Sequence, residues 1–203
     1  MNHPKRPPQL ILASTSPYRA ELLRRLEVPF DAAPPDFDER ALDDQLEALG
    51  IREFACTLAR GKARSLAAQH PGKWILGADQ LAVVSEDPPE VLHKPGNEAR
   101  ALETLMRLRG RSHLLVTAVV LVHADSDRCL EAIDVHTLTM RAFSREEAAA
   151  YICAYKPLNC AGSYRIEDAG IKLFESVSGE DFTGIIGLPL LATARLLRGA
   201  GLL

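Results

Sequence analysis

The feature that most constrains this chain is an apolar run that passes through a hydroxyl-rich turn directly into a basic helix. The stretch 10–26 reads LILASTSPYRAELLRRL. Its first four residues suit a strand covered on both faces, although their periodicity alone fits a buried helix as well. Ser16 is a favourable N-cap, and Pro17 suits the first helical position, because an N–H group there would lack a partner anyway. A helix is therefore expected to start at this point.

The start of this helix has the chemistry of an anion-binding site. Ser14, Thr15 and Ser16 offer hydroxyl and backbone N–H donors, and a helix N-terminus carries unpaired N–H groups with about half a positive charge. Arg19 adds a cation in the first turn, where a purely structural helix would favour Asp or Glu. A bound phosphate explains this choice, and a solvated arginine on a well-capped helix is the simpler alternative.

Length and charge limit the class of protein. A chain of 203 residues fits one large or two-lobed domain, and we predict a single domain over 1–203 with 1–8 as a flexible leader. The net charge of -3 argues against non-specific binding to nucleic acid, which needs a large basic surface, and favours a small anionic ligand. No apolar run approaches the roughly 20 residues of a membrane span, so no membrane association is expected.

The four cysteines point to a reducing compartment. Cys56, Cys129, Cys153 and Cys160 show neither a CxxC pair nor zinc-site spacing with histidine. Disulfides are rare in the cytoplasm, and unpaired cysteines there commonly act as small buried apolar residues. We therefore expect a cytoplasmic protein with four such cysteines.

A group of acidic residues follows the strand predicted over 28–33. If the chain stays extended here, Asp36 and Asp38 share one face and Glu39 points to the other. Solvated loop carboxylates are the simpler interpretation. A role in binding a divalent metal or activating water requires a partner elsewhere in the chain.

Asp79 is the most unusual residue of the sequence. It stands inside the predicted strand 74–84, WILGADQLAVV, where a buried carboxylate is costly unless it is paired or coordinates a ligand. Gly77 would let a ligand or another backbone approach closely. These features favour a functional role, and a carboxylate satisfied by backbone amides is the alternative.

Two lysines complete the set of candidate charged groups. Lys62 lies on the apolar stripe of a helix predicted over 51–69, so it either extends past the edge of the core or reaches into a cleft. Lys94 precedes Pro95 and so stands beside a rigid turn. Cations together with carboxylates suit phosphoanhydride hydrolysis, because the cations neutralise the polyphosphate and a carboxylate activates water. A serine hydrolase fits less well, because the GxSxG elbow is missing.

The rest of the chain alternates between helices and a hairpin. Strands are expected over 113–123 and 129–141, joined by a turn. Helices are expected over about 97–107, 144–155 and 189–198, and 162–190 is expected to form site-forming loops with a short strand.

Several motifs resemble, in order, those of the Maf nucleotide pyrophosphatases. They are ASTSPYRAELL at 13–23, Asp38-Glu39, Leu58-Ala59-x-x-Lys62-Ala63, Gly77-Ala78-Asp79-Gln80 and Lys94-Pro95. The resemblance covers nearly the whole chain. It implies a mixed α/β fold of the inosine-triphosphatase type, with an elongated sheet, flanking helices and two lobes around a central cleft. It also implies hydrolysis of a nucleoside triphosphate to the monophosphate and pyrophosphate.

This resemblance and the charges together suggest roles for the candidate residues. We expect Asp79 to activate water, and Glu39 with Asp79 to hold a divalent cation, Mg²⁺ or Mn²⁺. The expected grip on the triphosphate comes from Ser14, Ser16, Arg19, Lys62 and Lys94, the two lysines acting also in catalysis.

Three positions bear on the choice of base. Tyr18, Gln80 and Glu167 resemble the aromatic, glutamine and glutamate residues of the 7-methyl-GTP pyrophosphatase branch. They differ from the arginine, threonine and glutamine of the branch acting on dTTP and UTP. A 7-methylguanine ring is cationic, so Tyr18 can stack on it, although tryptophan, common in that branch, is the stronger cation–π partner. Glu167 can accept hydrogen bonds from the base.

Two other functions stay open at this point. The chain could be a nucleotide-binding regulator of cell division that need not cleave its ligand, or a pyrophosphatase directed to dTTP, UTP or inosine triphosphate. In each case the partner is a small nucleotide triphosphate, and the apolar stretch 183–190 leaves room for a homodimer.

Overall fold

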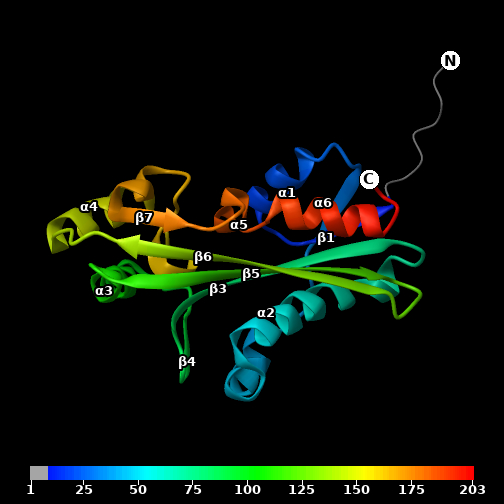
Figure 1. The fold of residues 1–203 in the computed structure, drawn as a ribbon, viewed down its shortest axis with the longest axis horizontal. Coiled ribbons are helices and arrows are strands. Elements are labelled where there is room, and N and C mark those ends of the chain that lie inside the picture. Colours follow the sequence, from blue (N-terminus) through cyan, green and yellow to red (C-terminus); the bar gives the residue numbers. More distant parts are fainter. Residues whose placement is uncertain (1–8) are drawn as a thin grey trace.

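The computed structural model describes residues 9–203, so the leader predicted over 1–8 lies outside the described residues. Seven strands form one mixed sheet in the order β2-β1-β3-β5-β6-β7, with β4 paired to β3 beside this path (Figure 1). The strands are β1 (Leu10–Ala13), β2 (Phe30–Ala33), β3 (Trp74–Glu86), β4 (Pro89–Leu92), β5 (Ser112–His123), β6 (Cys129–Met140) and β7 (Phe174–Ser178). The mixed α/β class expected from the sequence is confirmed.

In the part of the chain that the structure describes, six α-helices flank this sheet. They are α1 (Pro17–Arg24), α2 (Leu46–Arg64), α3 (Glu98–Leu108), α4 (Arg145–Tyr155), α5 (Phe182–Ile186) and α6 (Leu190–Gly199). Short 3-10 helices connect them: η1 (Glu39–Gln45), η2 (Ala67–Gln69), η3 (Ala161–Ser163) and η4 (Ala169–Leu173). Within residues 9–203, no helix is both long and apolar enough to cross a membrane.

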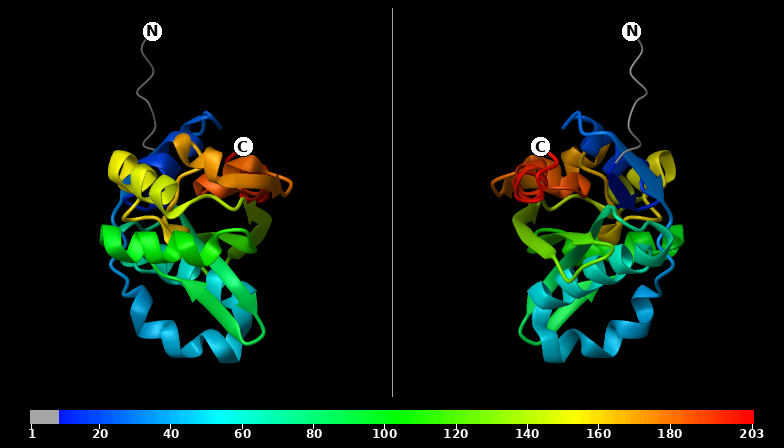
Figure 2. Two further views of the ribbon diagram at one scale, coloured as in Figure 1. Left: turned by 90° about the vertical axis from the view of Figure 1, so that its left-hand side faces the viewer. Right: turned by 90° about the vertical axis from the view of Figure 1, so that its right-hand side faces the viewer.

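The helices cover the two faces of the sheet in different ways. α2 lies alone along one face, and α1 and α6 lie on the other, as Figure 2 shows. The α2 face is an apolar cluster that includes Ile75, Leu81 and Val116. The opposite face carries two separate clusters, one under α1 and α6 and one under α3 and α4. The central strands β1, β3 and β5 are thus buried on both faces along most of their length, which explains their nearly continuous apolar sequences.

The long strand β3 differs from its prediction in length and continuity. It runs through Asp79 without interruption and ends two residues later than expected, at Glu86. The segment around Pro88 and Pro89, predicted as a loop, turns back as the antiparallel strand β4. Proline is tolerated here because β4 pairs with β3 on only one of its edges, as expected for an edge strand.

Helix α2 also differs from the helix predicted over 51–69. It begins at Leu46, contains a kink at Gly50, whose φ is 71°, and ends at Arg64. Glycine adopts this left-handed conformation without strain, which lets the chain bend into the apolar part of the helix.

The prediction for the cysteines is only partly right. Cys56 is buried, Cys129 and Cys160 are partly buried, and Cys153 is exposed. The expectation of a small buried apolar residue is therefore wrong for Cys153, which lies on the outward face of α4.

Candidate active site

The candidate site lies where one edge of β3 has no strand partner. β5 pairs with β3 along the whole of 74–83 on one edge. On the other edge, β1 pairs at 74–76 and β4 at 82–86. Among the described strands, none pairs with 77–81 on that second edge, and Asp79 stands in its middle. Charged side chains can therefore reach this edge of β3 from both faces.

The hydroxyl-rich turn opens onto this gap. β1 is parallel to β3 and Leu12 is paired with Leu76, so the chain that leaves β1 emerges beside the unpaired residues. Ser14 is buried, and its hydroxyl accepts a hydrogen bond from the Ser16 amide at 3.1 Å. Ser16 caps α1 by accepting from the Arg19 amide at 3.4 Å. The N-terminus of α1 thus starts at the gap, which is a favourable place for an anion.

Two glycines allow close contacts of α2: Gly77 on β3 meets the backbone of α2, and Gly61 within α2 meets the Phe37 ring. A Cβ atom on Gly77 would lie 2.1 Å from the carbonyl oxygen of Ala59, and one on Gly61 would lie 2.3 Å from the Phe37 ring. Only glycine fits at Gly77, because the atom that a Cβ would meet there belongs to the backbone. The close approach expected at Gly77 therefore involves the backbone of α2, and it sets the depth at which Lys62 enters the site.

Lys62 links the two candidate carboxylates. Its ammonium nitrogen lies 2.5 Å from Asp79 Oδ1 and 2.8 Å from Glu39 Oε1, and the side chain is buried. Burial of a lysine is costly unless it is paired, and here two carboxylates compensate it. The lysine on the apolar stripe therefore reaches inward and does not extend past the core.

Glu39 reaches this position from the first turn of η1. The preceding residue, Asp38, caps η1 by accepting from the Arg40 amide at 3.0 Å. The amide of Asp36 donates to the Ser65 hydroxyl at 3.2 Å. Of the three acidic residues, Glu39 alone turns toward Lys62, and Asp38 has a local structural role.

The electrostatics join Arg19 and Lys94 to this pair of carboxylates. Arg19 is partly buried, and its Nε donates to the Gly187 carbonyl at 2.9 Å. Burial lowers the pKa of Arg19, and the nearby Asp79 and Glu39 act in the opposite direction. Partial burial acts to raise the pKa of Glu39, but Lys62, Lys94 and Arg19 outweigh it and hold the pKa below its usual value. The structure thus brings all five predicted charged residues together.

Each of the two carboxylates leaves one oxygen that a metal ion could use. Lys62 uses one oxygen of Glu39 and one of Asp79, which leaves the second oxygen of each for another ligand. In residues 9–203, no three side chains of the His, Cys, Asp and Glu types gather as a metal site. Two carboxylates fit Mg²⁺, which commonly completes its shell with substrate phosphates and water.

The three residues predicted to choose the base are arranged less compactly. Tyr18 is exposed at the surface. The pKa of Arg165 is raised, because burial, which lowers it, is outweighed by Asp168 and then by Tyr18. Tyr18 therefore lies close to Arg165. Glu167 follows Arg165 by two residues. Partial burial, and then the charge of Asp168, raise the pKa of its carboxyl group. Tyr18 and the segment of Glu167 are therefore neighbours.

Gln80 faces away from Asp79. Successive residues of a strand point to opposite faces, so Asp79 points to α2 and Gln80 to α5. The Gln80 amide nitrogen donates to Thr117 Oγ1 at 3.0 Å and to the carbonyl oxygens of Gly184 at 2.8 Å and Ile185 at 3.0 Å. One ligand can reach both Asp79 and Gln80 only across the unpaired edge of β3.

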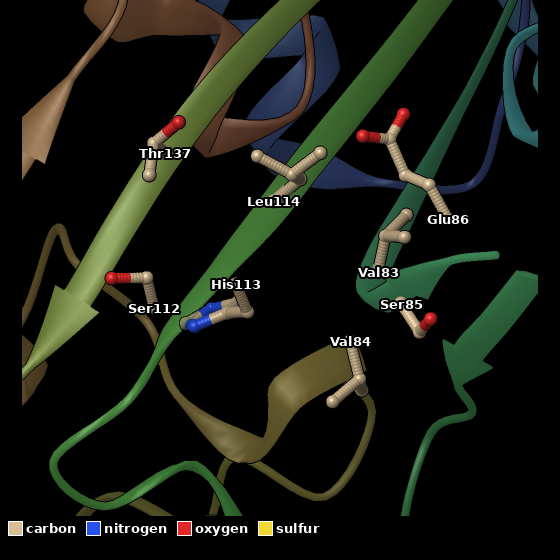
Figure 3. A pocket seen from close by; sticks show the side chains of 8 residues that line it. All are labelled: Val83, Val84, Ser85, Glu86, Ser112, His113, Leu114 and Thr137. Atoms are coloured by element: carbon tan, nitrogen blue, oxygen red, sulfur yellow. The ribbon is translucent and has the colours of Figure 1, made fainter.

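A separate hollow of about 200 Å³ lies further along β3, and it contains none of the predicted site residues (Figure 3). His113 lines it but is buried, with its Nε2 atom 2.7 Å from the Tyr164 hydroxyl. Burial lowers the pKa of His113 to about 4. This histidine is a neutral core residue, and the charge cluster, not the hollow, defines the candidate site.

Thr117 and Gly187 also take part in the site, although neither was predicted from the sequence. Thr117 is a single polar residue within the apolar strand VTAVV, a signal of the same kind as Asp79. Gly187 acts through its carbonyl oxygen, which no side-chain pattern could reveal.

Known proteins match this chain over nearly its whole length. The family described as "Maf: Maf-like protein" matches residues 9–200. The chain is 41% identical over 194 residues to a protein of Albidiferax ferrireducens named "7-methyl-GTP pyrophosphatase", covering 96% of this chain and 94% of that one. A protein of the same name from Pseudomonas putida is 41% identical over 194 residues, with 96% and 97% covered. A third, from Xanthomonas campestris pv. campestris, is 42% identical over 195 residues with the same coverage.

Proposed function

The chain belongs to the Maf family, and we propose that it hydrolyses 7-methyl-GTP to 7-methyl-GMP and pyrophosphate. One observation carries the reaction class: three cations surround two carboxylates at the unpaired edge of β3. Such a set neutralises a polyphosphate and supplies a base for water. The choice of 7-methyl-GTP is supported by the names of the relatives and by the residues around Tyr18.

Asp79 is the proposed water-activating group. A general base must be held within hydrogen-bonding distance of its water, and Lys62 fixes one carboxylate oxygen of Asp79 at 2.5 Å. The attacking water is then proposed to give its proton to a lone pair of the Asp79 carboxylate that neither Lys62 nor a bound cation occupies. Lys62 also compensates the charge of Glu39, so that both carboxylates are held close together.

The triphosphate is proposed to lie against the turn after β1. Ser14 and Ser16 contribute hydroxyl and N–H donors, and the N-terminus of α1 adds its partial positive charge. Arg19, Lys62 and Lys94 balance the charge that develops on the leaving pyrophosphate.

A divalent cation, Mg²⁺ or Mn²⁺, is proposed to bind with the substrate. Glu39 and Asp79 would hold it through the oxygens that Lys62 does not use. When bound, it would stabilise negative charge on the phosphate oxygens. A chelator should therefore abolish turnover, and added Mg²⁺ or Mn²⁺ should restore it; full activity in excess chelator would refute the metal requirement.

Base selection is proposed to use both sides of the β3 edge. Tyr18 stacks on the cationic 7-methylguanine ring, and Glu167 accepts hydrogen bonds from the base N–H groups. Gln80 would take part in the selection of the base from the face of β3 opposite to Asp79. The biological effect would be removal of a modified nucleotide before a polymerase uses it.

We also propose a cytoplasmic location, because the four cysteines suit a reducing compartment. A homodimer is a further proposal, which sedimentation of the purified protein at several concentrations would test.

The function is tested with a panel of four nucleotides. Purified protein is incubated separately with 7-methyl-GTP, GTP, UTP and dTTP in the presence of Mg²⁺, and monophosphate and pyrophosphate are measured. We expect the highest kcat/KM with 7-methyl-GTP and equal amounts of the two products.

Each other outcome has a clear meaning. Faster turnover of UTP or dTTP would replace the proposed substrate with a pyrimidine nucleotide. Tight binding without pyrophosphate release from any nucleotide would refute the hydrolase and favour the regulator of cell division.

A further inference from the structure

Thr117 lies at the centre of a polar row that separates two apolar clusters. It is fully buried in β5, directly paired with Gln80 on β3 and with Asp134 on β6. The apolar cluster under α1 and α6 lies to one side of this row, and the cluster under α3 and α4 lies to the other. Helix α5 rests on the row itself. A buried hydroxyl in such a place needs a hydrogen-bond partner, so its contacts carry information.

The direction of each hydrogen bond in this row is fixed by chemistry. The Thr117 hydroxyl donates its single proton to the Gly184 carbonyl at 3.1 Å, so it accepts from Gln80 Nε2 at 3.0 Å. Nε2 also faces the carbonyl oxygens of Gly184 and Ile185, which cannot donate. The NH₂ end of the Gln80 amide must therefore face α5, and its Oε1 atom must point away from α5.

Helix α5 connects this row to the phosphate-binding side. A Cβ atom on Gly184 would lie 2.0 Å from Asp134 Oδ2, so α5 contacts the sheet at its closest point there. The helix ends at Gly187, whose φ of 119° suits glycine and whose carbonyl oxygen accepts from Arg19 Nε at 2.9 Å. The position of α5 therefore sets the position of the Arg19 guanidinium.

We propose that Thr117 is a positioning residue for the pyrophosphatase reaction. Its hydroxyl holds the Gln80 amide with Oε1 available as an acceptor for an N–H or O–H group of the nucleotide. The same hydroxyl anchors Gly184 and so keeps α5, and with it Arg19, in place. This inference rests on the proposed function, because Thr117 acts only through Gln80 and Arg19.

The test is the isosteric variant Thr117→Val, assayed with 7-methyl-GTP and GTP. We expect kcat/KM for 7-methyl-GTP to fall about tenfold, the scale of one lost buried hydrogen bond. The preference for 7-methyl-GTP over GTP should also fall. Thr117→Ser keeps the hydroxyl and should restore both values. If Thr117→Val fails to fold, Thr117→Cys, a small side chain with a weak donor, takes its place with the same expectation.

Two further variants separate positioning from general packing. Thr193→Val is the matched control, because the Thr193 hydroxyl is equally buried but donates only within α6, to Pro189. It should leave base preference unchanged. In the double variant Thr117→Val/Gln80→Leu, the base preference should equal that of Gln80→Leu alone, because Thr117 acts on the base through Gln80.

The results that would overturn the inference are distinct from those that refute the function. Wild-type activity with an unchanged base preference in Thr117→Val would overturn the inference alone. Additive losses of base preference in the double variant would likewise contradict it. A wild-type protein that releases no pyrophosphate would refute the proposed function and the inference together.

Discussion

Lys62 determines the charge state of the candidate site. Its ammonium group lies between Glu39 and Asp79, and it is the strongest of the cations that lower the pKa of Glu39. Without it, two carboxylates would face each other with their charges compensated only by Arg19 and Lys94. One lysine thus compensates the charge of both carboxylates in one small volume.

This role predicts a shift in the pH profile of Lys62→Met. Loss of the lysine raises the pKa of Glu39, so this carboxyl group ionises only at higher pH. The acidic limb of the kcat/KM profile should therefore move to higher pH, in addition to a loss of rate. Arg64→Met, at an exposed position on the same helix, is the control and should keep the wild-type profile. An acidic limb at the wild-type pH in Lys62→Met would contradict this role.

His113 predicts how stability depends on pH. Burial lowers its pKa from about 6.5 to about 4 in the folded state, so the unfolded state binds more protons between these values. The contribution of His113 to stability is complete above the pKa that this residue has in the unfolded state, and it is lost as the pH falls toward 4. From pH 7 to pH 5 the free energy of unfolding should fall by about 2 kcal/mol through this residue.

Denaturant unfolding at both pH values measures this contribution. His113→Phe should lack that part of the pH dependence, and the exposed variant His93→Phe should keep the wild-type slope. Equal slopes in wild type and His113→Phe would show that burial of this histidine does not affect stability in this way.

At the scale of elements, the contact between α2 and β3 holds the site together. The backbone of α2 passes so close to Gly77 that no Cβ atom fits between them. Because Lys62 is on α2 and Asp79 is on β3, this contact sets the distance between their charged groups. The geometry of the site is thus a property of two packed elements.

Gly77→Ala is therefore expected to affect activity more than stability. The added methyl group pushes α2 from the sheet, which should cost about 1–3 kcal/mol of unfolding free energy. The separation of Lys62 from Asp79 should lower kcat as well. Gly199→Ala is the matched control, since its Cβ atom would meet only the flexible Leu130 side chain, at 3.3 Å. Gly77→Ala with wild-type kcat would show that the close contact does not position the lysine.

At the scale of the whole molecule, local patterns predicted local structure well. The strand, turn and helix over 10–24 follow from apolar burial and capping, and the structure has them in that order. The anomaly of Asp79 was visible because a charge inside an apolar strand is costly. Each of these features depends on neighbours in sequence.

What the sequence could not reveal depends on pairing between distant segments. The unpaired edge of β3 exists because β1 ends and β4 begins at particular registers. The contact from Gln80 to Gly184 joins residues 104 positions apart. Strand β4 was missed because two prolines signal a loop, although they are also tolerated in an edge strand.

Asp79 is proposed to activate water at the edge of β3, and the variant Asp79→Asn removes this ability while keeping the shape of the side chain. Wild type and variant are incubated with 7-methyl-GTP and Mg²⁺, pyrophosphate release is measured, and thermal unfolding establishes that both are folded. An amide cannot accept the proton, so we predict a folded variant whose kcat is lower by about a hundredfold or more. A folded Asp79→Asn protein that releases pyrophosphate at the wild-type rate would contradict the account.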